Sequence, residues 1–374
     1  MNTITRNAIA AASILATALA AGAADARELV YGSWVSPKHS INSEALPRYF
    51  DAIAAASGGK LTWKLVAGGQ LMNGRGTVES VGDGIADAGF VVPTYVPSSL
   101  PATATIYSSL VFGDDIVAAG GAAVETLLLD CPQCKAEFKK NNAVTLAGYT
   151  ATPFVLMCSK PVTSLDDLKG KKVRVTGSGV KLMEMAGATP VAMSPAEATT
   201  ALQRGTVDCV LGSASWLKSY GYQDVAKHIL NFPMGMTGPV LTAYINRDTW
   251  NSLSDQEKQY HLDAAPLLVA HSVLTAYKKK DAETIKAAKE IGVTLYDGGP
   301  EFQALVDEFQ VVNKATTSEQ FRKIGLKDPE SIIDALHKNL KKWRALSKDI
   351  GDDVDKYRAV LKREIYDKLT IKDF

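Results

Sequence analysis

Alternating apolar and polar segments in the first hundred residues predict strands separated by helices. Three short apolar runs have the length of buried strands, at 29–33, 61–66 and 85–92. The helix between the first two is recognised by Leu46, Phe50 and Ile53, which recur at helical spacing, and a shorter helix is expected over about 74–81. This order of elements predicts a parallel sheet covered by helices.

The middle of the chain repeats the same rhythm. Further strands are predicted at 149–157, 172–175, 190–193, 206–211 and 240–245. Further helices are predicted at 180–186, 195–203, 255–280, 282–291 and 302–309. The strand at 240–245 lets the chain cross back to the first sheet. The charge-rich tail at 337–374 carries both signs, which is typical of a solvated, docked pair of helices rather than of a binding arm.

Composition agrees with a globular α/β protein. A chain of 374 residues is long enough for about two domains. Hydrophobic residues make up 46% and charged residues 22%, which argues against disorder and against a fibrous repeat. Lys and Arg total 41 against 40 Asp and Glu, a net charge of +1, so electrostatics favour neither a nucleic acid nor an anionic membrane as partner.

Residues 1–26 have the order of an export signal. Arg6 precedes an apolar run at 8–21, and this run of about 14 residues is shorter than the about 20 needed to span a bilayer. Ala24-Asp25-Ala26 fits a cleavage site, with Ala21-Gly22-Ala23 as the alternative. An uncleaved anchor or an Ala-rich core helix is the competing interpretation. We expect export to the periplasm and a mature chain that is not embedded in the membrane.

The four cysteines fit an oxidising compartment, where an even number favours disulfides and three connectivities are possible. Cys131 and Cys134 lie between two predicted helices, and a bridge stapling that turn is the favoured interpretation. A thioredoxin-type redox pair or free thiols are the alternatives. Cys158 and Cys209 would then form the second bridge. A zinc ribbon would need a second close pair, which the spacing lacks.

Motifs of catalysis are missing from the sequence. The five histidines form no metal-binding spacing, and there is neither a G-x-S-x-G elbow nor a Walker loop. Gly82-Asp83-Gly84 and Gly177-Ser178-Gly179 are fragments that do not complete a dinucleotide-binding loop. We therefore expect no catalytic residue, no metal and no cofactor.

The most informative stretch is Lys172-Val173-Arg174-Val175, in which the two valines point to one face of a strand and Arg174 to the other. Other short motifs surround it in order: Gly68-Gly69-Gln70-Leu71, Gly84-Ile85-Ala86-Asp87, Gly187-Ala188-Thr189-Pro190, Ala201-Leu202-Gln203-Arg204-Gly205, Val207-Asp208 and Ile245-Asn246-Arg247. From about 29 to 309 this set resembles the DctP-type extracytoplasmic solute receptors of tripartite ATP-independent periplasmic (TRAP) transporters.

The resemblance implies a role for Arg174. In that family the arginine of the K-x-R-V strand forms a bidentate salt bridge with the carboxylate of the ligand. A planar guanidinium presents parallel donors that match a carboxylate or sulfonate. Without the resemblance, Arg174 could equally be a surface arginine on an edge strand.

Two departures from the sialate-binding members narrow the expected solute. Gly212 stands where those members have an asparagine, and their second arginine is missing from 150–154. We therefore expect a monocarboxylate with an apolar or aromatic body, or a sulfonate. Besides Arg174, the expected ligand-binding residues are Trp216, Ser213, Phe154, Tyr95 and Trp34, with Arg75 and His39 as further polar contacts.

The resemblance also implies a two-lobed periplasmic binding protein of type II-like fold, each lobe a mixed, mostly parallel sheet flanked by helices. Its partners would be a small organic acid and the membrane permease of a TRAP transporter. We expect lobe I at 27–150 plus about 240–280, lobe II at 151–239 plus about 281–335, and a helical tail at 336–374. The alternatives are an ABC-type or sensor-coupled receptor, a periplasmic lyase or dehydratase on a receptor scaffold, and a disulfide oxidoreductase.

Overall fold

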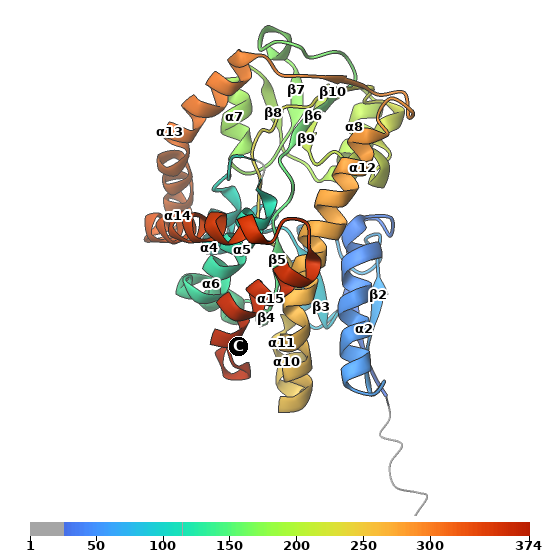
Figure 1. The fold of residues 1–374 in the computed structure, drawn as a ribbon, viewed down its shortest axis with the longest axis vertical. Helices are drawn as coiled ribbons and strands as arrows, with labels where there is room; N and C mark the ends of the chain where they lie inside the picture. Colours follow the sequence, from blue (N-terminus) through green and yellow to red (C-terminus); the bar gives the residue numbers. More distant parts are fainter. Residues whose placement is uncertain (1–25, 114) are drawn as a thin grey trace, which may run out of the picture.

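The chain forms two lobes, each built around one β-sheet (Figure 1). The computed structural model describes residues 26–113 and 115–374. Apart from Ala26, the predicted export signal and its cleavage sites lie outside the described residues. Within the described part of the chain, none of the helices combines the length and the apolar character needed to cross a membrane.

The first sheet has six strands. Five of them follow the order β2-β1-β3-β11-β4, and the sixth, β5, also pairs with β11. Its strands are β1 Arg27–Gly32, β2 Leu61–Val66, β3 Ala88–Val91, β4 Ala143–Thr145, β5 Gly148–Tyr149 and β11 Val240–Asn246. β1 is parallel to β2 and β3, whereas β11 is antiparallel to β3, β4 and β5. The predicted return of the chain to this sheet through β11 is confirmed.

The second sheet also has six strands, in the order β12-β10-β6-β9-β7-β8. They are β6 Val155–Cys158, β7 Lys172–Arg174, β8 Thr189–Val191, β9 Cys209–Gly212, β10 His228–Leu230 and β12 Thr294–Tyr296. β7 is parallel to both β8 and β9, and β6 is antiparallel to β9 and β10. The predicted class, two α/β lobes with mixed sheets, is confirmed.

Helices cover both sheets (Figure 1). The α-helices are α2 Leu46–Ala56, α3 Thr77–Gly82, α4 Pro101–Ser108, α5 Ile116–Leu129, α6 Pro132–Lys140, α7 Gly179–Met185, α8 Pro195–Gln203, α9 Trp216–Ser219, α10 Arg247–Ser252, α11 Asp255–Ala270, α12 Lys280–Lys286, α13 Pro300–Lys323, α14 Pro329–Leu346 and α15 Val354–Glu364. Two π-helical segments are η1 Ile41–Ala45 and η5 His271–Lys279, and the 3₁₀ turns are η2 Pro93–Tyr95, η3 Asp166–Leu168, η4 Tyr222–Asp224, η6 Ser347–Asp349, η7 Tyr366–Lys368 and η8 Ile371–Asp373.

The strand predicted at 149–157 is interrupted: Tyr149 ends β5 and Val155 begins β6, whereas residues 150–154 pass from one sheet to the other. The backbone there pairs with the second crossing segment: Ala151 N–H donates to Thr237 O and Phe154 N–H to Gly235 O, both at 2.9 Å. Pro153 has no N–H to give to a sheet. The two crossing segments therefore form backbone hydrogen bonds with each other, and together they connect the lobes.

One continuous helix replaces the two helices predicted over 255–291. It runs through α11, η5 and α12 and extends from the first lobe to the second (Figure 1). A wider π-helical stretch, η5, lies at its centre and packs against η1. π-helical turns inside helices are frequent at functional sites. This contact brings together two segments more than 200 positions apart in the chain.

The C-terminal helices α14 and α15 dock on the first lobe, where α14 packs along α5 and α15 along α11. The buried carboxylate of Glu125 on α5 anchors the tail. Its oxygens accept hydrogen bonds from Trp343 Nε1 and from Lys342 Nζ, both at 2.6 Å. Because removing either donor would leave a buried charge short of a partner, these contacts fix α14 in place.

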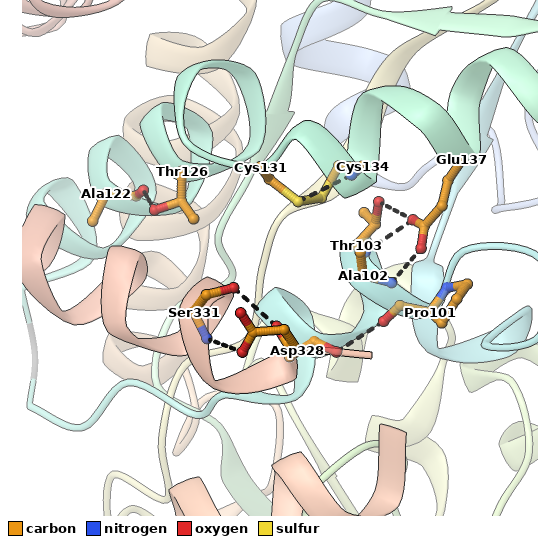
Figure 2. The surroundings of a disulfide bond; sticks show 11 residues. Pro101, Ala102, Thr103, Ala122, Thr126, Cys131, Cys134, Glu137, Asp328 and Ser331 are labelled. Carbon is orange, nitrogen blue, oxygen red and sulfur yellow. Dashed lines mark hydrogen bonds between the residues drawn. A yellow bond between two sulfur atoms is a disulfide. The ribbon is translucent and has the colours of Figure 1, made fainter. Parts of the chain in front are cut away.

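The cysteines form two disulfides, Cys131–Cys134 and Cys158–Cys209, and none of the described cysteines is free. The first staples the turn between α5 and α6, as predicted (Figure 2). The second joins directly paired positions of β6 and β9. Of the three possible connectivities, the structure contains the favoured one.

Candidate ligand-binding site

Arg174 is the last residue of β7, and only 2% of its surface is exposed. Its Nε donates to the carbonyl oxygen of Met193 at 2.8 Å, and Nη2 donates to the Tyr95 hydroxyl at 3.0 Å. Among the described residues, no carboxylate forms an ion pair with it. A guanidinium has five N–H donors, so three of them are left for another partner. A buried cation without a counterion is costly, which favours an anionic ligand here.

A cavity of about 30 Å³ lies beside Arg174 between the two sheets. Most of the predicted site residues line it together with Arg174: Trp34, His39, Tyr95, Phe154 and Trp216. Its volume accommodates one or two water molecules. For an organic acid to reach the guanidinium, the lobes or their side chains must therefore move apart.

Both lobes contribute walls to this inner cavity. Trp216, at the start of α9, lies over the guanidinium, with Arg174 Cζ 5.5 Å from its ring centroid, and the Phe154 ring packs on it at 5.6 Å. From the first lobe, Trp34 and Tyr95 face each other at 5.6 Å. Rings of this kind offer an apolar surface with few conformations to lose on binding.

Gly212 makes room for the tryptophan wall. A Cβ atom added at this position would clash with the ring of Trp216. The asparagine that sialate-binding receptors carry at this place therefore has no space here.

His39 lies before η1, and 3% of its surface is exposed. Ile41 N–H donates to its Nδ1 at 3.3 Å, so the proton of the neutral ring is on Nε2. Burial lowers the pKa of His39 to about 4. His39 is therefore a neutral hydrogen-bonding residue, and it does not add a second cation to the cavity.

Two predicted residues lie elsewhere. Arg75 is exposed in an outer cleft of about 790 Å³, which opens to solvent and shares Trp34 and Tyr95 with the inner cavity. Ser213 is fully buried but lines neither space; its hydroxyl accepts from Thr152 Oγ1 at 3.2 Å. The residue after β9 turns toward the crossing segment, so the prediction of Ser213 as a cavity residue is not supported by its position.

Sequence reasoning missed four tyrosines that line the inner cavity, namely Tyr107, Tyr149, Tyr220 and Tyr277. Tyr149 and Tyr277 are hydrogen-bonded through their hydroxyls at 2.9 Å although 128 positions separate them. No local motif signals such a contact. The one related signal in the sequence is the helical pattern that continues past Pro266 and includes Tyr277.

A metal centre is not indicated: residues 26–113 and 115–374 contain no cluster of three or more His, Cys, Asp or Glu side chains suited to hold an ion. The buried Asp281 is instead fully used by the protein. It accepts the backbone N–H of Ser215 at 2.9 Å and of Ala214 at 3.2 Å, and also contacts the Thr152 hydroxyl. These bonds fix the start of α9, which carries Trp216.

Two curated proteins are similar in sequence. The chain is 26% identical to the ectoine-binding periplasmic protein TeaA of Halomonas elongata, over 46% of this chain and 58% of TeaA. It is 23% identical to the monocarboxylate 2-oxoacid-binding periplasmic protein of Nostoc sp., over 80% of this chain and 78% of that protein. The chain thus spans less than two thirds of the length of TeaA.

The fold is similar to that of a TRAP solute-binding protein from Rhodoferax ferrireducens T118, solved in complex with copurified benzoate. The TM-score is 0.74 at 19% identity, over 86% of this chain and 99% of that chain. The similarity concerns the arrangement of two mixed sheets flanked by helices.

The DctP family, described as bacterial extracellular solute-binding protein, family 7, matches residues 31–323. The match begins near the end of β1, includes all the other strands of both sheets and the residues of the inner cavity, and ends before α14. The activity of this family is solute binding and not catalysis, so the lyase, dehydratase and oxidoreductase alternatives are not retained. The resemblance stated from the motifs is confirmed: the chain belongs to the DctP family of extracellular solute-binding proteins.

Proposed function

We propose that this protein is a periplasmic receptor that binds a small organic acid in the inner cavity and delivers it to the membrane permease of a TRAP transporter. The observation that carries the proposal is Arg174, a buried cation with unused donors and no resident carboxylate, beside a ring-lined cavity between two lobes. The acid would supply the missing negative charge.

The geometry favours a planar anion. Nε of Arg174 is held by Met193 and one Nη2 hydrogen by Tyr95, so the guanidinium is fixed before the ligand arrives. A carboxylate or sulfonate can accept two parallel bonds from such a fork, and both bonds strengthen when water is excluded. Preorganisation of this kind lowers the cost of binding.

The walls support a monocarboxylate with an apolar or aromatic body. Arg174 is the one cation among the described residues that line the inner cavity, so a second carboxylate would be buried without a counterion. The names of the relatives agree with this class: the Nostoc protein is named for monocarboxylate 2-oxoacids, and the Rhodoferax structure holds benzoate.

Binding would be coupled to closure of the two lobes. We assign 27–150 plus about 240–280 to lobe I, 151–239 plus about 281–335 to lobe II, and 336–374 to the tail. The sheet membership of the strands and the two crossing segments support this division. Because Tyr95 and Arg174 come from different lobes, an acid held by both stabilises the closed arrangement.

A thermal-shift comparison tests the proposed function. Benzoate, benzenesulfonate and aliphatic monocarboxylates are compared with benzamide, which keeps the ring but has no charge. An acid that binds stabilises the folded protein by about 2.7 kcal/mol at about 100 times its dissociation constant. We expect acids and not the amide to raise the melting temperature. A protein stabilised equally by benzamide and benzoate would contradict a site organised around Arg174.

A further inference from the structure

A hydrogen-bonded cluster of Tyr149, Tyr277 and His39 lines the same cavity as Arg174. The hydroxyls of Tyr149 and Tyr277 lie 2.9 Å apart, and the Tyr277 hydroxyl lies 3.5 Å from His39 Nε2. All three side chains are buried. Tyr277 belongs to η5 and His39 precedes η1, so the packing of these two π-helical segments holds the cluster together.

The hydrogen bonds within this cluster leave one phenol hydrogen over. Since Nδ1 of His39 accepts from the backbone, Nε2 carries the proton and donates to the Tyr277 oxygen. One phenol hydrogen then bridges Tyr149 and Tyr277. The other phenol hydrogen has no acceptor among the described residues. A buried donor without a partner destabilises the folded protein, because it loses its hydrogen bond to water.

Trp216 adds another donor to the same place. Its Nε1 is buried and has no hydrogen-bond partner in the part of the chain that the structure describes. Trp216 lines the same cavity as Tyr277, and its ring packs edge-on against that of Tyr220 at 5.9 Å. An indole N–H can only donate. The cluster and Trp216 thus each leave one donor without an acceptor among the described residues.

Ring contacts connect this group of donors to the guanidinium. On one side, ring contacts lead from Arg174 to Trp216, from Trp216 to Tyr220 at 5.9 Å, and from Tyr220 to His39 at 5.9 Å. A solute that lies among these rings can therefore meet both Arg174 and the donors.

Resting on the proposed function, we propose that the solute carries, besides its carboxylate, a second, uncharged oxygen that accepts hydrogen bonds from the Tyr149–Tyr277–His39 cluster. A hydroxyl, an ether or an oxo group has the required lone pairs. A wholly apolar body would leave the donors unpaired, and a site of this kind discriminates strongly against the analogue that lacks the oxygen. The second oxygen is uncharged because Arg174 is the one cation among the described lining residues.

Matched acids test the proposal by calorimetry. Benzoate is compared with 3-hydroxybenzoate and 4-hydroxybenzoate, and phenylacetate with its ring-hydroxylated forms. In the wild-type protein we expect at least one hydroxylated acid to bind about tenfold or more tightly than its parent, as one satisfied buried donor predicts. In Tyr277→Phe and in Tyr149→Phe the ratio of the two affinities should fall toward one.

Tyr244→Phe is the matched control, because the Tyr244 hydroxyl is buried, as those of Tyr149 and Tyr277 are, but Tyr244 does not line the cavity. It should leave the ratio unchanged. The proposal is overturned if parent and hydroxylated acids bind equally, or if both tyrosine variants keep the preference. If acids bind but Arg174→Ala leaves the affinity for parent and hydroxylated acids unchanged, the proposed function itself fails; equal binding with full dependence on Arg174 rejects the second-oxygen proposal alone.

Discussion

Arg174 of the second lobe donates a hydrogen bond through Nη2 to the hydroxyl of Tyr95 in the first lobe, over 3.0 Å. Tyr95 belongs to the turn η2 that follows β3, whereas Arg174 ends β7. Burial raises the pKa of Tyr95 to about 12, and the charge of Arg174 counters part of this rise. The phenol is therefore neutral, and its own hydrogen is available to an acid bound next to it.

Removing the Tyr95 hydroxyl should weaken the binding of the acid. Tyr95→Phe keeps the ring that faces Trp34 but removes a contact between the lobes and a donor to the ligand. We expect an affinity loss of about tenfold, the effect of about 1.4 kcal/mol. Calorimetry measures it. Tyr366→Phe is the control, because its buried hydroxyl is also hydrogen-bonded, to the Leu146 carbonyl at 2.9 Å, but lies in the tail. Equal affinity in Tyr95→Phe and wild type would contradict the contact's role.

The buried histidines make the protein sensitive to acid. Burial lowers the pKa of both His39 and His261 to about 4, below the ordinary value of 6.5. The unfolded chain takes up these protons first, so stability is lost as the pH falls from about 6.5 to 4. Each histidine accounts for up to about 3 kcal/mol of this loss.

Urea denaturation at a series of pH values checks the effect of His261. Its Nε2 accepts from Trp63 Nε1 at 3.1 Å, an interaction that protonation of the ring removes. His261→Gln should lower the stability at pH 7 and flatten the decline between pH 6.5 and 5, where few carboxylates titrate. The same slope in wild type and variant would show that His261 does not titrate as described.

Glu137 should have the opposite pH dependence. Its buried carboxylate accepts from the backbone N–H groups of Ala102 and Thr103 at the start of α4, close to the Cys131–Cys134 bridge (Figure 2). Burial nevertheless raises the pKa of Glu137 to about 7. The folded state keeps the proton longer than the unfolded state, so stability is lost as the pH rises from about 4.5 to 7.

Replacing the ionisable group isolates this contribution. Glu137→Gln cannot ionise, and its side-chain oxygen can still accept from α4. We expect the variant to gain up to about 3 kcal/mol relative to wild type between pH 4.5 and pH 8. Unfolding free energies at these two pH values give the comparison. A constant difference between the two proteins across this range would refute the assignment.

The two disulfides should differ in their contribution to stability. Cys131 and Cys134 are three positions apart, whereas Cys158 and Cys209 are separated by 51. Because a bridge restricts the unfolded chain more when its loop is longer, we expect losses of about 2 kcal/mol for the first pair and about 4 kcal/mol for the second. Denaturation of the two double Cys→Ala variants measures both. A larger loss for the short loop would argue against this explanation.

Local signals in the sequence were sufficient to predict most of the fold and some of the residues that line the inner cavity. β1, β2 and β11 are apolar runs of strand length, and α8 follows the N-cap residue Ser194, whose side chain accepts a hydrogen bond from Glu197 N–H. The three-residue strands β10 and β12 were missed, because such short elements form only when a neighbouring strand is present.

Within the site, Arg174 and the rings of Trp34, Tyr95, Phe154 and Trp216 were identified through a resemblance of motifs, and the cavity brings them together. Tyr149 and Tyr277 could not be found in this way, because a crossing segment and a π-helical turn bring them together. Long-range packing of this kind leaves no periodic trace in either segment.

Calorimetric titration of an acid found by the thermal screen, carried out on Arg174→Ala, Arg174→Lys and Arg75→Ala, tests the central claim most directly. Both arginines were sequence candidates, but Arg174 lines the inner cavity and Arg75 the outer cleft. We predict a loss of about a hundredfold or more for Arg174→Ala, a smaller loss for Arg174→Lys, which keeps the charge but not the fork, and little change for Arg75→Ala. Thermal melts of each variant confirm that it is folded. Full affinity in folded Arg174→Ala, or loss of binding in Arg75→Ala alone, would contradict the account.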